Sequence, residues 1–201
     1  MNKNRIDQTD HFLKPENMIK LYSMGAFPMA RPEEPDIVEW FLPDERTIIP
    51  INSFNFPRSL RKFMETCDFE IRLDRDFEGV VKACADRETT WISPKLIEAY
   101  RRILKMGHVH TVEVYQKDKL VGGLYGISYK GAFFGESMFS RVPQASKVAL
   151  VSLIKHLAER GYRLLDVQLM TEHLRMFGAV EISSEEYNSL LKQSFHAECL
   201  F

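Results

Sequence analysis

The sequence has little that would assign it to a membrane-spanning or secreted class. No apolar run approaches the roughly 18 to 20 residues that a helix needs to cross a bilayer. The first twelve residues, MNKNRIDQTDHF, lack the apolar stretch that directs secretion. We therefore expect a cytoplasmic protein that does not associate with membranes.

Cysteine is also scarce, with three among 201 residues, and no CxxC pattern joins Cys67, Cys84 and Cys199. Reduced, structural thiols are the expectation for such cysteines in a cytoplasmic protein. His108 and His110 are two residues apart, but no Cys, Asp or Glu accompanies them at a ligand spacing. We expect neither a disulfide framework nor a metal site.

An excess of charge of either sign is missing as well, because 27 Lys and Arg face 28 Asp and Glu, for a formal charge of -1. Any nucleic-acid binding must therefore come from a local patch. One candidate is the helix predicted at PRSLRKFMETC, where Arg58, Arg61 and Lys62 group on one side. Contacts with phosphates and an ordinary solvated face both fit this pattern.

A carboxylate within an apolar run is the first candidate for chemistry. Glu136 lies in FFGESMFSR, which the aromatic content and flanking glycines predict to be a strand. A buried carboxylate without a partner costs several kcal/mol. Glu136 must therefore have a dedicated partner or face a cavity that binds a ligand, and the local sequence leaves both open.

A second candidate is the strand LLDVQL, where strict alternation would place Asp166 and Gln168 on one face and Leu165, Val167 and Leu169 on the other. The pair could form a structural polar network or line a site in which Asp166 orients the amide of Gln168. No GxSxG motif or cysteine nucleophile with an evident histidine partner is present. A carboxylate, an amide and an apolar pocket suit catalysis by positioning.

Periodicity and turn signals predict an α+β fold with a mixed sheet. A small N-terminal α/β subdomain is expected over residues 1–50, with Pro15 to Met24 as a helix, FPMARPEEPD as a loop, and a strand pair at Ile37 to Leu42 and Thr47 to Ile51. Residues 51–201 should form the larger domain. Its expected helices lie at 57–67, 77–85, 94–106, 145–160, 171–177 and 185–192, and its strands at 69–74, 110–116, 119–129, 132–140, 162–169 and 179–183. A three-stranded meander, a long helix and a parallel strand, in that order, are the acetyltransferase-like (GNAT-type) layout.

Two long segments carry a resemblance to a known family: GGLYGISYKGAFFGESMFSRVPQASKVAL and LLDVQLMTEHLRMFGAVEIS. With YSMGAFPM, WFLPDER, CADRETTWIS and EAYRRILKMGHVHTVEVYQKDKLVGG, they closely resemble the leucyl/phenylalanyl-tRNA-protein transferases, from about Pro15 to the C-terminus. The resemblance implies transfer of leucine or phenylalanine from its charged tRNA to an N-terminal Arg or Lys, which marks the acceptor protein for degradation; methionine is a further candidate donor. It implies no metal or cofactor. A monomer is the default, since no heptad pattern or unexplained apolar stripe is present.

The same resemblance implies roles for particular residues. Trp91 matches the aromatic that stacks on the terminal adenosine of the tRNA, and Glu136, Asp166 and Gln168 match the groups that hold and orient the reactants. Arg58, Arg61 and Lys62 match the basic helix that meets the acceptor stem. Six apolar residues match the pocket for the donor side chain: Leu124, Phe133, Met138, Leu150, Leu153 and Leu165.

Two positions depart from the family pattern. Met29 replaces the tryptophan of an FPW motif, and Trp40-Phe41 stands where two tryptophans are common. Altered donor or acceptor specificity and a non-catalytic tRNA- or degron-binding adaptor therefore stay open. A CoA-dependent N-acetyltransferase of the same fold is the other alternative. However, the loop from Ser140 to Ala145 contains no glycine and includes Pro143, which has no amide for a pyrophosphate.

Overall fold

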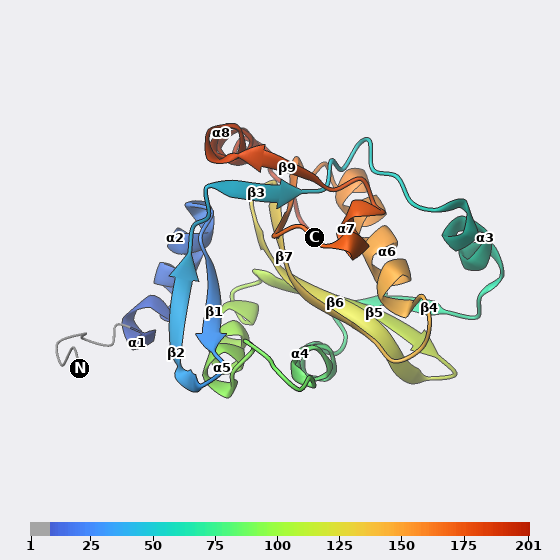
Figure 1. Ribbon diagram of the computed structural model, residues 1–201, viewed down its shortest axis with the longest axis horizontal. Coiled ribbons are helices and arrows are strands. Elements are labelled where there is room, and N and C mark those ends of the chain that lie inside the picture. The colour runs from blue at the N-terminus through green and yellow to red at the C-terminus, as the bar shows by residue number, and fades with distance from the viewer. Residues whose placement is uncertain (1–8) are drawn as a thin grey trace.

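A seven-stranded sheet forms the centre of the computed structural model, which describes residues 9–201 (Figure 1). The strand order is β4-β5-β6-β7-β8-β3-β9. The strands are β3 (Glu45–Ile48), β4 (Glu70–Leu73), β5 (Val109–Gln116), β6 (Lys119–Tyr129), β7 (Ala132–Ser140), β8 (Leu164–Gln168) and β9 (Val180–Ser183). The helices are α1 (Thr9–Phe12), α2 (Pro15–Ser23), α3 (Arg58–Thr66), α4 (Phe77–Ala85), α5 (Pro94–Leu104), α6 (Ala145–Glu159), α7 (Glu172–Arg175) and α8 (Ser184–Ser194).

The predicted meander is confirmed in β5, β6 and β7, which pair antiparallel in sequence order. The first turn places Lys117 and Asp118 at φ 49° and 60°, the left-handed pair that suits a tight hairpin. After β7 the chain crosses through α6 and returns as β8, parallel to β7. The α+β, acetyltransferase-like layout predicted from the sequence is therefore correct.

Alternating residues of the meander supply two hydrophobic cores, one on each face of the sheet. Leu124 and Phe133 belong to the core beneath α6. Their neighbours Tyr125 and Phe134 belong to the core on the other face, where Tyr125 packs edge-on against Tyr100 of α5 with ring centroids 5.4 Å apart. The sheet is thus covered by α6 on one face and by α4 and α5 on the other (Figure 1).

The segment FPMARPEEPD was wrongly predicted to be a loop. It forms β1 (Phe27–Arg31) and the start of β2 (Glu34–Phe41), a separate two-stranded antiparallel sheet. Three prolines suggested irregular structure, but a proline is compatible with a strand at an edge, and both strands of this sheet are edges. Arg31 forms ion pairs with Glu34 and Glu39 across the hairpin, which helps to hold its register.

The predicted pairing of 37–42 with 47–51 is also wrong. β2 pairs with β1, whereas β3 enters the large sheet between β8 and β9 and is antiparallel to both. The turn residues Pro43 and Asp44 carry the chain from one sheet to the other instead of closing a hairpin. The division of the chain at residue 50 stays a prediction.

The N-terminal segment contains one helix that the pattern did not predict, α1 at Thr9–Phe12. The rest of the polar N-terminal stretch, residues 1–8, lies outside the described residues. Within residues 9–201, no helix has the length and apolar character required to cross a membrane.

Candidate functional site

A cavity of about 290 Å³ opens at the C-terminal end of β8, beside the middle of β6 and of β7, and α6, α7 and strand β1 also contribute to its wall. Its wall is largely apolar, and six of the seven residues predicted for substrate binding line it: Trp91, Leu124, Met138, Leu150, Leu153 and Leu165. Phe27 and Met29 of β1 close one side. Met29 therefore occupies the cavity wall where the family motif has tryptophan.

Phe133 is the exception among the predicted pocket residues. It is fully buried near the start of β7 and packs beside Tyr162 and Phe201, with ring centroids 6.5 Å and 5.6 Å away. Met138 is five residues further along the same strand, roughly 17 Å at the strand rise. The structure therefore places Phe133 in the core below the cavity, outside its wall.

Glu136 has both dedicated partners and a place in the cavity wall, although it is only 8% exposed. The Tyr22 hydroxyl donates to its Oε1 at 2.9 Å, and the Tyr100 hydroxyl donates to its Oε2 at 2.7 Å. Burial raises the pKa of Glu136 to about 7, and the hydrogen bonds from Tyr100 and Tyr22 offset that rise only in part. The carboxylate is satisfied without a directly bonded cation and can change charge near neutral pH.

Gln168 meets Glu136 inside the cavity, with its Nε2 atom 3.5 Å from the Glu136 Oε1 atom. Gln168 has φ +61°, a left-handed conformation that costs about 1–3 kcal/mol for a residue other than glycine. Gln168 lines the cavity with its amide beside Glu136, whereas Asp166 is not among the residues of the cavity wall. That Asp166 and Gln168 share a strand face stays a prediction.

Asp166 does orient Gln168, but through the backbone. Its Oδ1 accepts a hydrogen bond from the Gln168 backbone amide at 2.9 Å, which holds the unusual φ angle. Asp166 is fully buried and lies outside the cavity wall. Arg46 donates to it from Nε at 2.9 Å and from Nη2 at 2.6 Å, and the Tyr187 hydroxyl donates at 2.7 Å.

Arg46 is the central residue that the sequence analysis missed. Its guanidinium is 1% exposed and lies between two aromatic rings, 4.7 Å from the Phe27 centroid and 4.9 Å from the Tyr187 centroid. Burial alone would lower the pKa of Arg46, but Asp166 outweighs this and raises it, so the guanidinium keeps its charge. A lone arginine in the run DERTIIPI was the signal that could have indicated a buried partner.

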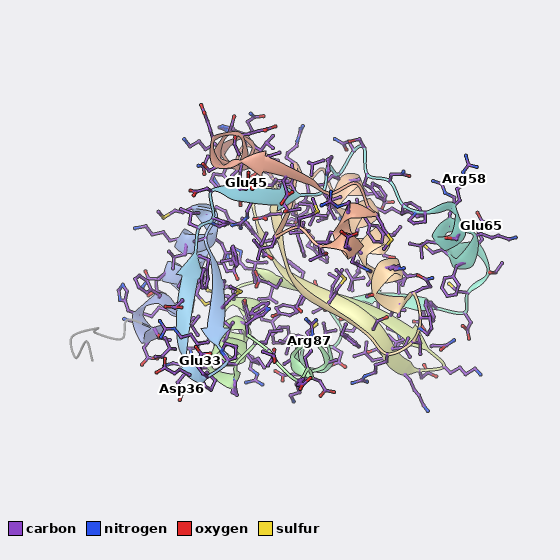
Figure 2. The ribbon with its side chains drawn as sticks, in the orientation of Figure 1. Glu33, Asp36, Glu45, Arg58, Glu65 and Arg87 are labelled. Atoms are coloured by element: carbon purple, nitrogen blue, oxygen red, sulfur yellow. The ribbon has the colours of Figure 1, made fainter. Side chains whose placement is uncertain are left out.

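Two further groups at the cavity mouth come from the segment that joins α4 to α5. Arg87 donates from Nη2 to the Met138 carbonyl at 2.6 Å and to the Ser137 hydroxyl at 3.2 Å, which places its guanidinium beside the opening (Figure 2). The Trp91 carbonyl accepts from the Ala30 amide at 3.0 Å and ties this segment to β1. Trp91 is therefore held in position at the edge of the cavity.

The predicted basic side chains are not brought to the cavity. Arg58, Arg61 and Lys62 are exposed on α3, at the end of the molecule opposite the β1–β2 sheet (Figures 1 and 2). The Arg61 guanidinium stacks over Phe56 at 5.1 Å from the ring centroid. No carboxylate of residues 9–201 forms an ion pair with any of the three, so their charges are available to an external partner.

No group of three His, Cys, Asp or Glu side chains converges to hold a metal ion in the described part of the chain. The described cysteines Cys67, Cys84 and Cys199 are all free thiols, and burial raises the pKa of Cys84 to about 12. The site therefore consists of an apolar cavity, the buried carboxylate of Glu136 and the side-chain amide of Gln168.

Several solved structures show a weak similarity. L-PGS from Bacillus licheniformis has 11% identity and a TM-score of 0.44, with 80% of this chain and 55% of that chain covered. A functionally unknown conserved protein from Staphylococcus epidermidis has 12% identity and a TM-score of 0.43, with 90% of this chain and 66% of that chain covered. AAC(6')-Iy, solved with a bisubstrate analogue that contains CoA, has 14% identity and a TM-score of 0.39, with 62% of this chain and 90% of that chain covered. The chain therefore spans about half to two thirds of the first two proteins.

Two family models match the sequence directly. The leucyl/phenylalanyl-tRNA protein transferase model matches residues 48–192, and the model of the N-terminal domain of the same proteins matches residues 13–44. Together they include Glu136, Asp166 and Gln168, and they favour this assignment over an acetyltransferase or an adaptor. The chain belongs to the leucyl/phenylalanyl-tRNA-protein transferase family, which is a family of aminoacyltransferases.

Proposed function

We propose that the cavity holds the side chain of leucine or phenylalanine esterified to the 3′ end of tRNA, and that Glu136 and Gln168 hold the reacting groups. The meeting of a buried carboxylate and an amide, 3.5 Å apart at the polar end of an apolar cavity, supports this most strongly. The acceptor is a protein that begins with Arg or Lys, and the new N-terminal residue marks it for degradation.

The reaction needs positioned groups more than a nucleophile from the protein. The neutral acceptor α-amine attacks the ester carbonyl carbon, and a C–N bond forms as the bond to the tRNA 3′ oxygen breaks. The amine gives up one proton, and the departing 3′ oxygen gains one. Gln168 binds and aligns the reactants, because an amide is too weak a base to remove the proton.

Glu136 stabilises the positive charge that develops on the attacking amine. Its pKa of about 7 means that the ionised form becomes dominant as the pH rises above neutrality. Tyr22 and Tyr100 hold its two oxygens in place. The proton then passes to the leaving oxygen through water or the ribose hydroxyl.

The tRNA contacts lie on two separate surfaces. Trp91 stacks on the terminal adenosine at the cavity mouth, an interaction worth about 1–3 kcal/mol. Arg58, Arg61 and Lys62 on α3 contact phosphates of the acceptor stem. The apolar wall discriminates between donor side chains by about 1–3 kcal/mol per methylene.

All of these residues come from one chain, so we expect a monomer to be active. Charged tRNA is a cytoplasmic substrate, which supports a cytoplasmic location.

The test is transfer of radiolabelled leucine from charged tRNA to peptides that begin with Arg, Lys, Asp, Glu or Ala. We expect transfer only to Arg and Lys peptides, strongly reduced in Gln168→Ala. The matched control is Gln193→Ala, which removes an exposed glutamine of α8 and should leave transfer unchanged. If charged tRNA binds but no peptide is labelled, the adaptor hypothesis replaces this proposal.

A further inference from the structure

A second cavity, of about 490 Å³, adjoins the first through Gln168. It lies against β3, β8 and β9, and both Gln168 and Leu169 line the two cavities together. The second cavity therefore reaches the reacting groups from a different side than the donor pocket does. A substrate that enters through it would meet Gln168 without crossing the apolar wall.

The lining of this cavity is acidic. Asp44, Glu45 and Glu181 contribute carboxylates, and no Lys, Arg or His among the described residues lines it. No basic side chain of residues 9–201 forms an ion pair with any of the three. Uncompensated negative charge next to the reacting amide favours a cationic ligand.

The sheet register fixes how far these charges lie from the chemistry. Thr47 on β3 is paired with Gln168 on one side and with Glu181 on the other. Glu181 is therefore two strands from Gln168, roughly 10 Å at the usual strand spacing. This separation suits a long side chain whose charge is remote from its own α-amine, as in lysine and arginine.

Gln168 itself has an unused hydrogen-bonding group. The residue is 9% exposed, and its Nε2 atom reaches Glu136 only at 3.5 Å. Its side-chain oxygen accepts no hydrogen bond from the described residues and is not among their fully buried, unpaired polar atoms, so it is open to a ligand. An amine N–H at the junction of the two cavities would supply the missing donor.

We propose that this acidic cavity is the acceptor subsite, in which Asp44, Glu45 and Glu181 bind the cationic side chain of the acceptor's first residue while its α-amine lies at Gln168. This inference rests on the transferase function proposed above and extends it to acceptor selection. The three carboxylates are not gathered into a metal-binding group within residues 9–201, and their spread suits one extended cation. The charge preference for Arg and Lys then comes from the far end of the acceptor side chain.

The test compares peptides that begin with arginine and with citrulline, its neutral counterpart, which keeps the same α-amine and a similar shape. We expect wild-type protein to prefer arginine in kcat/KM. Glu181→Gln and Glu45→Gln should each reduce that preference by about threefold to tenfold, because the carboxylates are exposed and their charge interactions are partly screened. The KM for charged tRNA should stay unchanged, because the donor side chain lies in the other cavity.

Glu33→Gln is the matched control. It removes the same charge at the β1–β2 turn, far from Glu45 (Figure 2), and should leave the arginine preference intact. If Glu181→Gln and Glu45→Gln both keep the wild-type preference for arginine over citrulline, the acidic subsite is wrong. That result would not contradict the transferase function. Wild-type protein that labels neither peptide would overturn both.

Discussion

Two buried carboxylates on neighbouring strands are held in opposite ways. Asp166 on β8 is paired with the Arg46 guanidinium and also accepts hydrogen bonds from Tyr187 and the Gln168 amide. Glu136 on β7 is directly bonded to no cation of residues 9–201, and two tyrosine hydroxyls satisfy its oxygens. The first arrangement fixes a charge, whereas the second leaves a carboxyl group whose pKa is about 7.

The two carboxylates therefore have different roles in one site: Asp166 holds the structure, and Glu136 takes part in the reaction. Asp166 and Arg46 neutralise each other and hold the strained backbone of Gln168 without touching the cavity. Glu136 lines the cavity, and its charge responds to pH in the range where an amine becomes a nucleophile. The predictions below test this division.

The largest effect should come from breaking the fixed pair. Asp166→Asn leaves the Arg46 guanidinium charged and buried, and we expect it to lower the free energy of unfolding by about 3–5 kcal/mol in urea titrations. The double variant Arg46→Met/Asp166→Asn removes the unpaired buried charge. Its loss in the free energy of unfolding should be smaller than the sum of the losses in the two single variants. A loss below about 1 kcal/mol for Asp166→Asn would mean that the pair does not fix the site.

Glu136 should affect stability in a pH-dependent way. Its pKa is raised in the folded state from 4.5 to about 7, so the folded protein holds the proton more tightly than the unfolded chain. The resulting stability is present below about pH 4.5 and is lost as the pH rises through 7. The free energy of unfolding of Glu136→Gln, relative to that of the wild type, should therefore rise by up to about 3 kcal/mol between pH 4.5 and pH 7.5, as measured by urea unfolding. A difference that stays constant with pH would show that the carboxyl group is not titrating near neutrality.

Removing one tyrosine hydroxyl from each network sharpens the comparison. Tyr100→Phe and Tyr187→Phe each delete a hydrogen bond to a buried carboxylate, and each should cost about 1.5–3 kcal/mol of stability. Only Tyr100→Phe should also move the pH midpoint of transfer upward, because the Tyr100 hydrogen bond lowers the pKa of Glu136. An equal shift in both variants would remove the distinction between the two networks.

The smallest effect on stability should come from α3, which lies outside both networks. Arg58→Gln should change the free energy of unfolding by less than about 0.5 kcal/mol, because the side chain is exposed and forms no ion pair with the described residues. It should weaken tRNA binding and reduce the slope of log affinity against log salt by about 1. Glu65→Gln on the same helix is the control, and its slope should match that of the wild type.

Periodic features could be predicted from the sequence, and contacts between distant segments could not. Helix periodicity and turn residues located α5, α6 and the meander, and motif matching located Glu136 and Gln168. Arg46 and Asp166 are 120 residues apart, and no local pattern connects them. Tyr100 lies on the buried side of α5, but its hydrogen bond to Glu136 depends on how α5 packs on the sheet, which no local pattern predicts.

Two errors arose from rules that tertiary structure overrode. Proline content suggested a loop at β1, although this strand lies in a two-stranded sheet that tolerates proline at its edges. The turn residues Pro43 and Asp44 suggested a hairpin between 37–42 and 47–51, but β3 enters the large sheet beside β8 and brings Arg46 to Asp166. In both cases the departure builds the site, since β1 supplies Phe27 and Met29 to its wall.

The most direct test of the account is the pH dependence of single-turnover leucine transfer by wild-type protein and Glu136→Gln, with charged tRNA saturating and an Arg peptide kept well below its KM, where ionisation of the free amine is observed. The acceptor amine titrates with a pKa of about 7.7–8.0 in both proteins and serves as an internal reference. We predict that the transfer rate of the wild type shows a further rise as the pH passes through about 7. Glu136→Gln should be slower, and this rise in rate should be missing from its profile. Identical pH profiles for the two proteins would contradict the assignment of Glu136 to the reaction.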